Sequence, residues 1–269
     1  MFPVPLSFLF DFGRMNPDAR PSIMHELAAN GVKHIVLSDE LISMILQSRG
    51  MVKTLKSEMA AEGLDFVDAH APFGRELDLN CNIPVCRKQL ILRHKLHLAI
   101  AAEMGVDTIT IHIGNDHQFP DVPLEEQLKN VKDALAQLLP VAEEYGVAIA
   151  IENIWFRINT PENLLSIKAD FPSDYLGFCY DAGHANLMSK GYLNPESNPF
   201  SAWKAVGVDT PAWDDHILEK MLPYIINTHL HDNDGVWDLH KNIGTGTVDW
   251  KHVIPLLTTA PKLKNMQSE

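Results

Sequence analysis

Residue types that commonly bind metal ions stand at the ends of successive short apolar segments, and this pattern restricts the folds open to the chain. They are His70, His112, Glu152, Asp181, His229 and Glu269. Apolar runs of this length, such as residues 147–151, are typical of buried β-strands. The intervals of roughly 30 to 50 residues leave room for a helix and its connecting loops, as parallel strands require. Because each polar residue ends its segment, the strands are predicted to converge on one site.

Strand and helix patterns alternate along the chain. Strands are expected at residues 7–10, 34–37, 65–70, 108–112, 147–152, 176–181, 226–229 and 264–269, and helices at 17–30, 41–61, 84–104, 124–145 and 161–169, the last entered through Thr160 as an N-cap. Eight such steps without a change in composition indicate one closed (β/α)₈ barrel over residues 1–269, an α/β fold. The sequence stops at Glu269, inside the eighth strand, so the eighth helix is expected to be absent.

The alternation of side chains supports closure of the sheet. In the fifth strand Ala148, Ala150 and Glu152 share one face, while Ile149 and Ile151 share the other. We expect the small and polar set to point into the barrel and the aliphatic set to pack against the helices. An open doubly wound sheet is the alternative, but it would gather functional residues at one switch point and not around six strands.

The composition limits the classes of partner. With 46% hydrophobic residues, the 269-residue chain can form one large domain with a substantial core. Its net charge of −13 argues against nucleic acid and anionic membranes, because phosphate binding relies on Lys and Arg. No apolar run approaches the roughly 20 residues of a membrane helix. The three cysteines form no CxxC pair or even-numbered disulfide set, which favours the cytoplasm. Residues 1–11 lack a basic stretch, and we interpret them as leading into a first strand and not as a signal peptide.

One long segment, residues 187–215, interrupts the regular alternation. It is rich in proline, glycine and aromatic residues, among them Tyr192, Trp203 and Trp213. Such a segment is often a lid over a site or a contact in a homo-oligomer, and a packed surface excursion is the equally weighted alternative.

Three further motifs lie where the strands end. Asp181 and His184 leave the sixth strand together, His229 and His231 stand two residues apart on the seventh, and Asp238 and His240 precede a glycine turn. Active sites of parallel barrels lie at this end of the strands. Imidazole and carboxylate ligands without thiolate suit Zn, Mn, Co, Fe or Mg. A divalent metal ion is therefore the predicted cofactor.

The motifs together resemble a known family. His70-Ala71-Pro72, Ile151-Glu152-Asn153, Asp181-Ala182-Gly183-His184, His229-Leu230-His231-Asp232 and Asp238-x-His240 followed by Gly244-x-Gly246-x-x-Asp249-Trp250 are similar to the xylose-isomerase-like TIM-barrel superfamily, which contains sugar isomerases and epimerases and the endonuclease-four type of apurinic-site nuclease. The resemblance runs from the first strand to the last residue.

In the isomerase and epimerase branch, the resemblance implies one metal held by Glu152, Asp181, His229 and Glu269. The two glutamates would transfer the proton next to a metal-bound carbonyl or hydroxyl, on a sugar or sugar phosphate. His184 would bind a substrate hydroxyl. His70, His112 and His240 would bind substrate or orient a ligand as readily as they would bind metal. The implied partner is a small carbohydrate.

In the nuclease branch, the resemblance implies three zinc ions and a phosphodiester substrate. The ligands would be His70, His112, Glu152, Asp181, His184, His229, Asp238, His240 and Glu269. The acidic Asp39 and Glu40 after the second strand favour the sugar enzyme, because a nuclease should present cations there. A sugar-binding barrel without turnover is the third alternative. His231 is interpreted as a neighbour of the site, and the histidines elsewhere, including His94 and His97, as structural or solvated.

Overall fold

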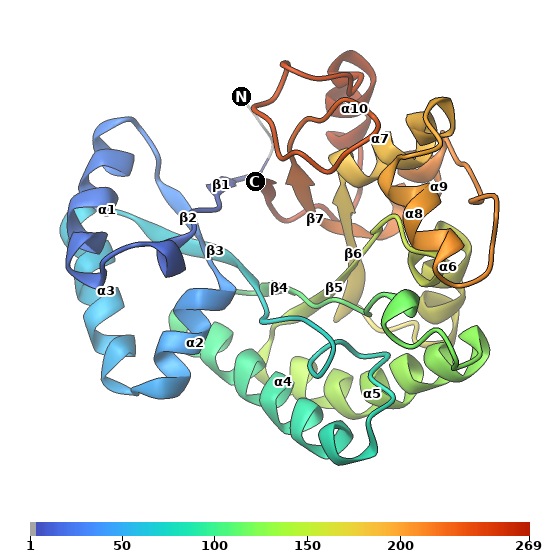
Figure 1. Ribbon diagram of the computed structural model, residues 1–269. Helices are drawn as coiled ribbons and strands as arrows, with labels where there is room; N and C mark the ends of the chain where they lie inside the picture. Colours follow the sequence, from blue (N-terminus) through green and yellow to red (C-terminus); the bar gives the residue numbers. More distant parts are fainter. Residues whose placement is uncertain (1–3) are drawn as a thin grey trace.

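Eight parallel strands close into a barrel in the structure, a computed structural model that describes residues 4–269 (Figure 1). The strands are β1 (Leu6–Phe8), β2 (His34–Leu37), β3 (Asp65–His70), β4 (Thr108–Thr110), β5 (Ala148–Glu152), β6 (Leu176–Asp181), β7 (Ile225–Leu230) and β8 (Met266–Ser268). Each strand pairs with the next, and β8 returns to β1 through the pair Leu6↔Met266. The predicted (β/α)₈ fold is confirmed. Residues 1–3 of the segment interpreted as leading into the first strand lie outside the described part.

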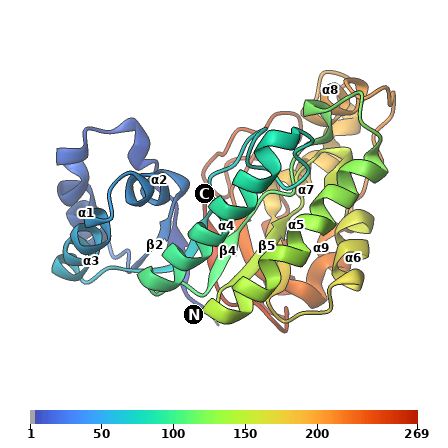
Figure 2. The same ribbon diagram turned by 90° about the horizontal axis from the view of Figure 1, so that it is seen from below.

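Helices surround the barrel (Figures 1 and 2). The α-helices are α1 (Arg20–Ala29), α2 (Asp39–Gln47), α3 (Gly50–Glu62), α4 (Pro84–Met104), α5 (Leu124–Tyr145), α6 (Pro161–Asp170), α7 (Ala182–Lys190), α8 (Asn198–Lys204), α9 (Ile217–Met221) and α10 (Trp250–Leu257). The long helices α4 and α5 run side by side, as Figure 2 shows. Each ends at a glycine with positive φ, Gly105 and Gly146, the backbone conformation that a side chain disfavours.

Several predicted boundaries needed correction. The helix expected over 41–61 is two helices, α2 and α3, because Ser48 adopts an extended backbone between them. The first strand lies at Leu6–Phe8 and not at residues 7–10, and β4 ends two residues before His112. Thr160 occupies the N-cap position of α6 with an extended backbone, but its side chain caps no backbone N–H.

The barrel interior holds the small and polar side chains that the alternation predicted. Ala148 and Ala150 form a separate small cluster inside, whereas Ile149 and Ile151 belong to the main core against the helices. One layer of the interior is polar, and Asn227 donates there to Thr110 at 3.2 Å and to Asp68 at 3.4 Å. The carboxylates and imidazoles at the strand ends therefore lie above an interior that is already polar.

Short helical pieces form part of the segment 187–215, and its remainder is irregular. It holds the end of α7, the 3₁₀ turn Gly191–Leu193 and α8. Trp203 on α8 is buried, and its indole N–H donates to the carbonyl of Trp155 in the loop after β5 at 2.9 Å. The segment is thus packed against the loops at the site end of the barrel; a role as lid or oligomer contact stays a prediction. Among the described residues, no helix is both long and apolar enough to cross a bilayer.

Candidate metal centre

Strand pairing brings the predicted site residues to one level at the C-terminal end of the barrel. His70, Glu152 and Asp181 are the last residues of β3, β5 and β6, and Asp181 pairs in register with His229 of β7. His229 in turn pairs with Gln267, two residues before Glu269. All strands run in the same direction, so their last side chains face one region.

Glu152 lies at the centre of this region. Its carboxylate is 2.9 Å from His184 Nδ1, 3.3 Å from His112 Nε2 and 3.6 Å from His229 Nδ1. The residue is buried, with 1% of its surface exposed. Burial favours the neutral carboxyl, but the imidazoles of His229, His112 and His184 outweigh it and hold the pKa of Glu152 well below its usual range. Glu152 is therefore a carboxylate at neutral pH.

His229 Nδ1 lies among three carboxylates. The distances are 3.0 Å to Glu269 Oε2, 3.6 Å to Glu152 Oε1 and 3.7 Å to Asp181 Oδ2. Two ligands at about 2.1 Å from one ion lie about 3.4 Å apart at the tetrahedral angle. The separations of His229 from the three carboxylates match this spacing. Asp181, His229 and Glu269 offer atoms within 4.8 Å of one another, and Glu152 joins His229 in one adjoining group and Asp181 in another.

A second cluster adjoins the first. His184, His231, Asp238 and His240 offer nitrogen and oxygen atoms within 4.8 Å of one another. The rings of His231 and His240 stack face to face with centroids 3.9 Å apart. Burial disfavours the charged form of both His184 and Asp238. Asp181 and Asp238 nevertheless raise the pKa of His184 well above its usual value, and His184 and His240 depress that of Asp238. This cluster could hold a further cation.

His231, predicted from the sequence to be a neighbour of the site, belongs to this second cluster. It is fully buried, and its Nε2 lies 3.2 Å from Asp181 Oδ2. The signal was present in the sequence, because a residue two positions after His229 points to the same side of a strand. The spacing alone could not show that the loop with Asp238 and His240 folds back over His231.

A third group connects His70 and His112 to the centre. His70, Glu152 and His229 offer atoms within 4.8 Å of one another, and the rings of His70 and His112 meet edge to face at 4.9 Å. Nδ1 of His70 lies 3.0 Å from the carbonyl oxygen of Ala71, which can accept a hydrogen bond from the Nδ1–H group. Burial, assisted by His112 and His229, lowers the pKa of His70 to about 3. The neutral ring can then offer its Nε2 lone pair to the site.

The site opens into a cavity of about 730 Å³. This volume is typical of a small-molecule site. Aromatic side chains of Phe73, Trp155 and Phe156 line it above the histidines, and Phe73 lies against His112 with ring centroids 4.6 Å apart. Among the described residues that line the cavity, Arg14 is the one arginine or lysine, whereas Asp11, Asp39 and Glu40 add negative charge at the entrance.

The loop that carries Asp238 and His240 is anchored by Asp232. The Asp232 carboxylate accepts hydrogen bonds from the indole of Trp250 at 2.8 Å and from the backbone N–H groups of Gly244 and Val248 at 3.0 and 3.1 Å. Asp232 and Lys241 also exchange backbone hydrogen bonds. The motif from Asp232 to Trp250 thus fixes the position of the second cluster without contributing a ligand atom from Asp232.

Buried nitrogen and oxygen atoms that lack a hydrogen-bond partner show whether the site suits a metal ion. Six buried atoms at the site make no hydrogen bond of acceptable geometry; these are Glu152 Oε2, His184 Nδ1, His229 Nε2, His231 Nδ1, Asp238 Oδ1 and Glu269 Oε2. Buried polar atoms are normally paired because an unpaired one costs about 1–3 kcal/mol. Four of these atoms, Glu152 Oε2, His184 Nδ1, Asp238 Oδ1 and Glu269 Oε2, lie within 3.9 Å of an imidazole or carboxylate atom of the site, a spacing that fits ligands of divalent cations.

Comparison with known proteins agrees with this fold. A family model described as "Xylose isomerase-like TIM barrel" matches residues 24–261. The uncharacterized protein MJ1311 of Methanocaldococcus jannaschii is 30% identical over 192 residues, which represent 70% of this chain and 58% of the archaeal protein. The match therefore spans less than two thirds of that relative's length.

Solved structures give the same result over the whole barrel. A D-tagatose 3-epimerase-like protein aligns with a TM-score of 0.75 at 23% identity, covering 99% of this chain and 91% of its own. The TTHB071 protein of Thermus thermophilus, soaked with ZnCl₂, aligns with a TM-score of 0.61 at 26% identity and covers 91% of this chain and 85% of its own.

Proposed function

The chain belongs to the xylose isomerase-like TIM barrel family, and from this premise we propose that it is a divalent-metal-dependent isomerase or epimerase of a sugar or sugar phosphate. The observation that carries the proposal is His229 Nδ1 within 3.0 to 3.7 Å of the carboxylates of Glu269, Glu152 and Asp181. The metal would be Mn, Co, Mg or Zn, held by these four residues. The likeness to an epimerase-like structure supports the same class of reaction.

The protein's own residues would carry the proton transfer. A divalent cation at the four ligands would supply a positive charge that makes the C–H next to a bound carbonyl or hydroxyl more acidic. Glu152, ionised at neutral pH, is the base that removes this proton. The proton is returned either by Glu152 itself or by Glu269, the other catalytic carboxylate, after Glu269 has taken up a proton. Delivery to the opposite face of the same carbon inverts it. Delivery to the neighbouring carbon, with transfer of the hydroxyl proton to the former carbonyl oxygen, exchanges aldose and ketose.

Other residues of the site would bind the substrate. His70, His112, His184 and His240 all line the cavity and present ring nitrogens to hydroxyl groups. The rings of Phe73 and Trp155 exclude water from one side and offer an apolar surface to the C–H groups of a sugar. A small carbohydrate is therefore the proposed partner, and the cytoplasm stays the proposed location.

A three-zinc phosphodiesterase acting on abasic DNA is the second candidate. The observation in its favour is that eight of the nine ligands implied for it lie in overlapping groups, with His184, Asp238 and His240 clustered beside Glu152. The ninth, His112, lies 3.3 Å from Glu152. The acidic entrance of the cavity argues against this function. Asp11, Asp39 and Glu40 line it, and Arg14 is the one arginine or lysine among the described lining residues. A DNA backbone would meet repulsion there.

Three measurements on one preparation separate these functions. The first is metal content per chain by elemental analysis after purification without chelator. The second is the exchange of carbon-bound hydrogen for deuterium in D₂O, which NMR detects. The sugars tested are D-tagatose, D-fructose, D-glucose and their phosphate esters. The third is cleavage of an abasic duplex. We expect about one metal and sugar deuteration; cleavage of the duplex with three zinc ions would reverse the assignment. Sugar binding without deuterium uptake would identify a non-catalytic barrel.

The role of Glu152 is tested with a matched pair of variants. Glu152→Gln removes the base and keeps the shape, so deuterium uptake should fall by about 10² to 10⁴-fold. Glu144→Gln makes the same chemical change at an exposed position on α5 and should leave uptake unchanged. Equal rates in the two variants, with folds intact by circular dichroism, would overturn the role given to Glu152.

A further inference from the structure

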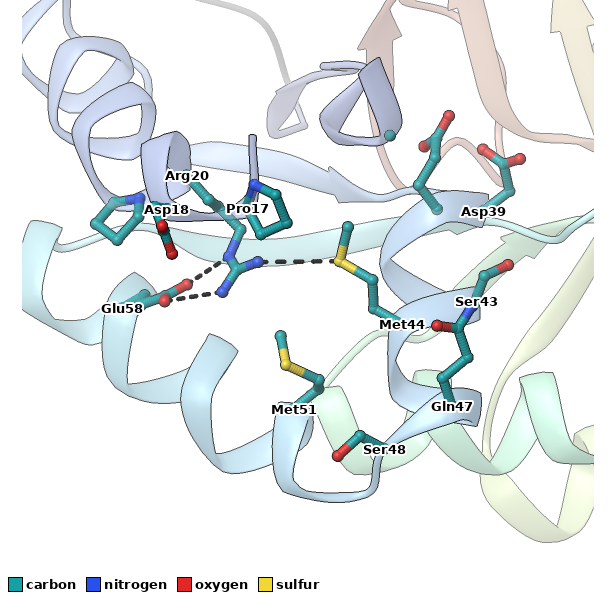
Figure 3. Close-up of a pocket in the computed structure, with 13 residues that line it drawn as sticks. Pro17, Asp18, Arg20, Asp39, Ser43, Met44, Gln47, Ser48, Met51 and Glu58 are labelled. Carbon is teal, nitrogen blue, oxygen red and sulfur yellow. Dashed lines mark hydrogen bonds and ion pairs between the residues drawn. The ribbon is translucent and has the colours of Figure 1, made fainter. Parts of the chain in front are cut away.

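A second cavity of about 740 Å³ lies between α1, α2 and α3 (Figure 3). It is lined by residues of the 3₁₀ turns before α1 and of the three helices, and Asp39 and Glu40 line both this cavity and the metal-site cavity. These two carboxylates stand on the first turn of α2, directly after the predicted substrate-facing end of β2. The two cavities therefore lie on either side of one acidic pair.

Arg20 is a buried donor at the wall of this second cavity. Its side chain is 8% exposed, and Nε and Nη2 donate to Glu58 at 2.7 and 2.9 Å. Nη1 has the thioether sulfur of Met44 at 3.9 Å, a weak acceptor (Figure 3). A guanidinium carries five N–H donors, so the Nη1 side of Arg20 remains able to donate to an oxygen atom in the cavity.

The charges around the cavity disfavour an anionic ligand. Among the described residues that line it are four carboxyl groups, those of Asp18, Asp39, Glu40 and Glu58, and one guanidinium, that of Arg20. Arg20 neutralises Glu58, so the excess negative charge lies on the other three carboxyl groups. Burial and the neighbouring charge of Glu40 raise the pKa of Asp39 to about 7, so this carboxyl group gains from any hydroxyl that donates to it. A phosphate or carboxylate would meet net repulsion, whereas a neutral molecule rich in hydroxyl groups would not.

The remaining wall is apolar. Pro17, Met44 and Met51 present ring and thioether surfaces to the space, while Ser43 and Gln47 add polar groups on the α2 side (Figure 3). Pro21 also lines the cavity. Carboxylates and a guanidinium for hydroxyl groups, combined with an apolar surface for C–H groups, are the chemistry that a neutral sugar ring requires. A flexible methionine surface adapts to such a ring.

We propose that the α1–α2–α3 cavity is a second sugar subsite, so that the substrate of the metal centre is a glycoside or disaccharide and not a single sugar. One ring would lie at the metal ligands and the other beyond Asp39 and Glu40, against Arg20 and Met44. The proposal rests on the proposed function for the first ring only. A Cβ at Gly13 would lie 2.5 Å from Cγ of Glu40, so the absence of a side chain at Gly13 leaves room for Glu40 between the cavities.

The experiment blocks the second cavity without touching the metal ligands. Ser43→Trp places an indole in it, and Leu46→Trp places the same side chain on the exposed face of α2, outside both cavities. Maltose, cellobiose, lactose and sucrose are compared with glucose, galactose and fructose by titration calorimetry, and saturation-transfer NMR shows which ring contacts the protein. Met51→Trp, from α3, serves as the second blocking variant if Ser43→Trp fails to fold.

We expect at least one disaccharide to bind the native chain tenfold or more tightly than its constituent sugars, with contacts to both rings. That preference should disappear in Ser43→Trp and persist in Leu46→Trp. Equal affinity for disaccharides and single sugars, or an undiminished preference in both blocking variants, would overturn the subsite. Preference in binding without deuterium uptake at carbon would instead overturn the proposed reaction and leave the subsite standing, so the two failures are distinguishable.

Discussion

His229 Nδ1 lies 3.0 Å from Glu269 Oε2, and this pair joins the end of β7 to the residue that follows β8. Burial opposes protonation of His229, but the neighbouring Cys179, Glu269 and Glu152 raise its pKa well above the usual value. Glu269 is also held by a backbone hydrogen bond from its N–H to the carbonyl of Leu230 at 3.2 Å. The last residue of the sequence is therefore fixed by contacts with β7 on both its backbone and its side chain.

Removal of divalent cations should lower the melting temperature. Without a cation, the carboxylates of Glu152, Asp181 and Glu269 repel one another across His229. A metal at 100 times its Kd stabilises the folded state by about 2.7 kcal/mol. Melting after chelation with EDTA, and again after addition of Mn²⁺, Co²⁺, Zn²⁺ or Mg²⁺, measures this effect and ranks the metals. Identical melting temperatures in all conditions would contradict a metal centre.

Lys168 should stabilise the barrel at the N-terminal ends of the strands, opposite the candidate metal centre. Its buried ammonium donates to the carbonyl groups of Ser173 at 2.6 Å and Leu176 at 2.7 Å, and Leu176 begins β6. Lys168→Met keeps the aliphatic stem but leaves these carbonyls without a donor, which costs about 1–3 kcal/mol. Urea unfolding should show this loss. Lys129→Met, which removes an exposed pair with Asp133, should change stability by less than about 0.5 kcal/mol.

The sequence was sufficient to predict the fold because its signals are local and repeated. Strand β3 and helices α4 and α5 were predicted to the residue, since Pro84 and the glycines after α4 and α5 mark their ends. The break between α2 and α3 was missed. Ser48 and Arg49 do not break a helix by their identity, and the break depends on how the two helices pack against their neighbours.

The sequence was sufficient to predict which side chains gather at the candidate site, but not the surroundings of that site. That these side chains bind a metal ion stays a prediction. Strand parity and position indicated which residues share the end of the barrel, as with Glu152 and Asp181. The membership of His231 and the cavity beside Arg20 both depend on loops and helices folding over the barrel. Such contacts between residues distant in sequence leave no periodic pattern for a single sequence to show.

The free energy of unfolding should fall as the pH is lowered, because two histidines outside the site, His94 and His97, are buried. His97 Nδ1 lies 3.3 Å from Nδ1 of His94, whose Nε2 donates to the carbonyl of Leu77 at 2.7 Å. Burial, followed by the charges of His94 and Arg93, lowers the pKa of His97 to about 3. The unfolded chain binds a proton near pH 6.5 and the folded chain does not, so stability is present above pH 6.5 and is lost as the pH falls below it.

The size of this effect can be isolated with one variant. Between pH 6.5 and pH 5, a single histidine kept neutral costs about 2 kcal/mol of unfolding free energy. His97→Asn retains a donor for His94 and removes the titration. The loss of stability between pH 7 and pH 5, measured by urea unfolding, should therefore be about 2 kcal/mol smaller in His97→Asn than in the native chain. If the unfolding free energies of the two proteins changed with pH in parallel, His97 would take up its proton equally well in the folded and unfolded chains, which would contradict the prediction.

Gly183 should be essential for the geometry of the second cluster. A Cβ on Gly183 would lie 2.0 Å from Cε1 of His231, so Gly183→Ala must displace this ring. The displacement would break the contact between His231 Nε2 and Asp181 Oδ2 and the stack on His240. We expect Gly183→Ala to reduce the affinity for divalent metal by tenfold or more, measured by competition with a chromogenic chelator. Ala185→Ser, on the same helix, is the control and should leave metal affinity unchanged. Native metal affinity in Gly183→Ala would show that His231 has no part in holding the metal centre.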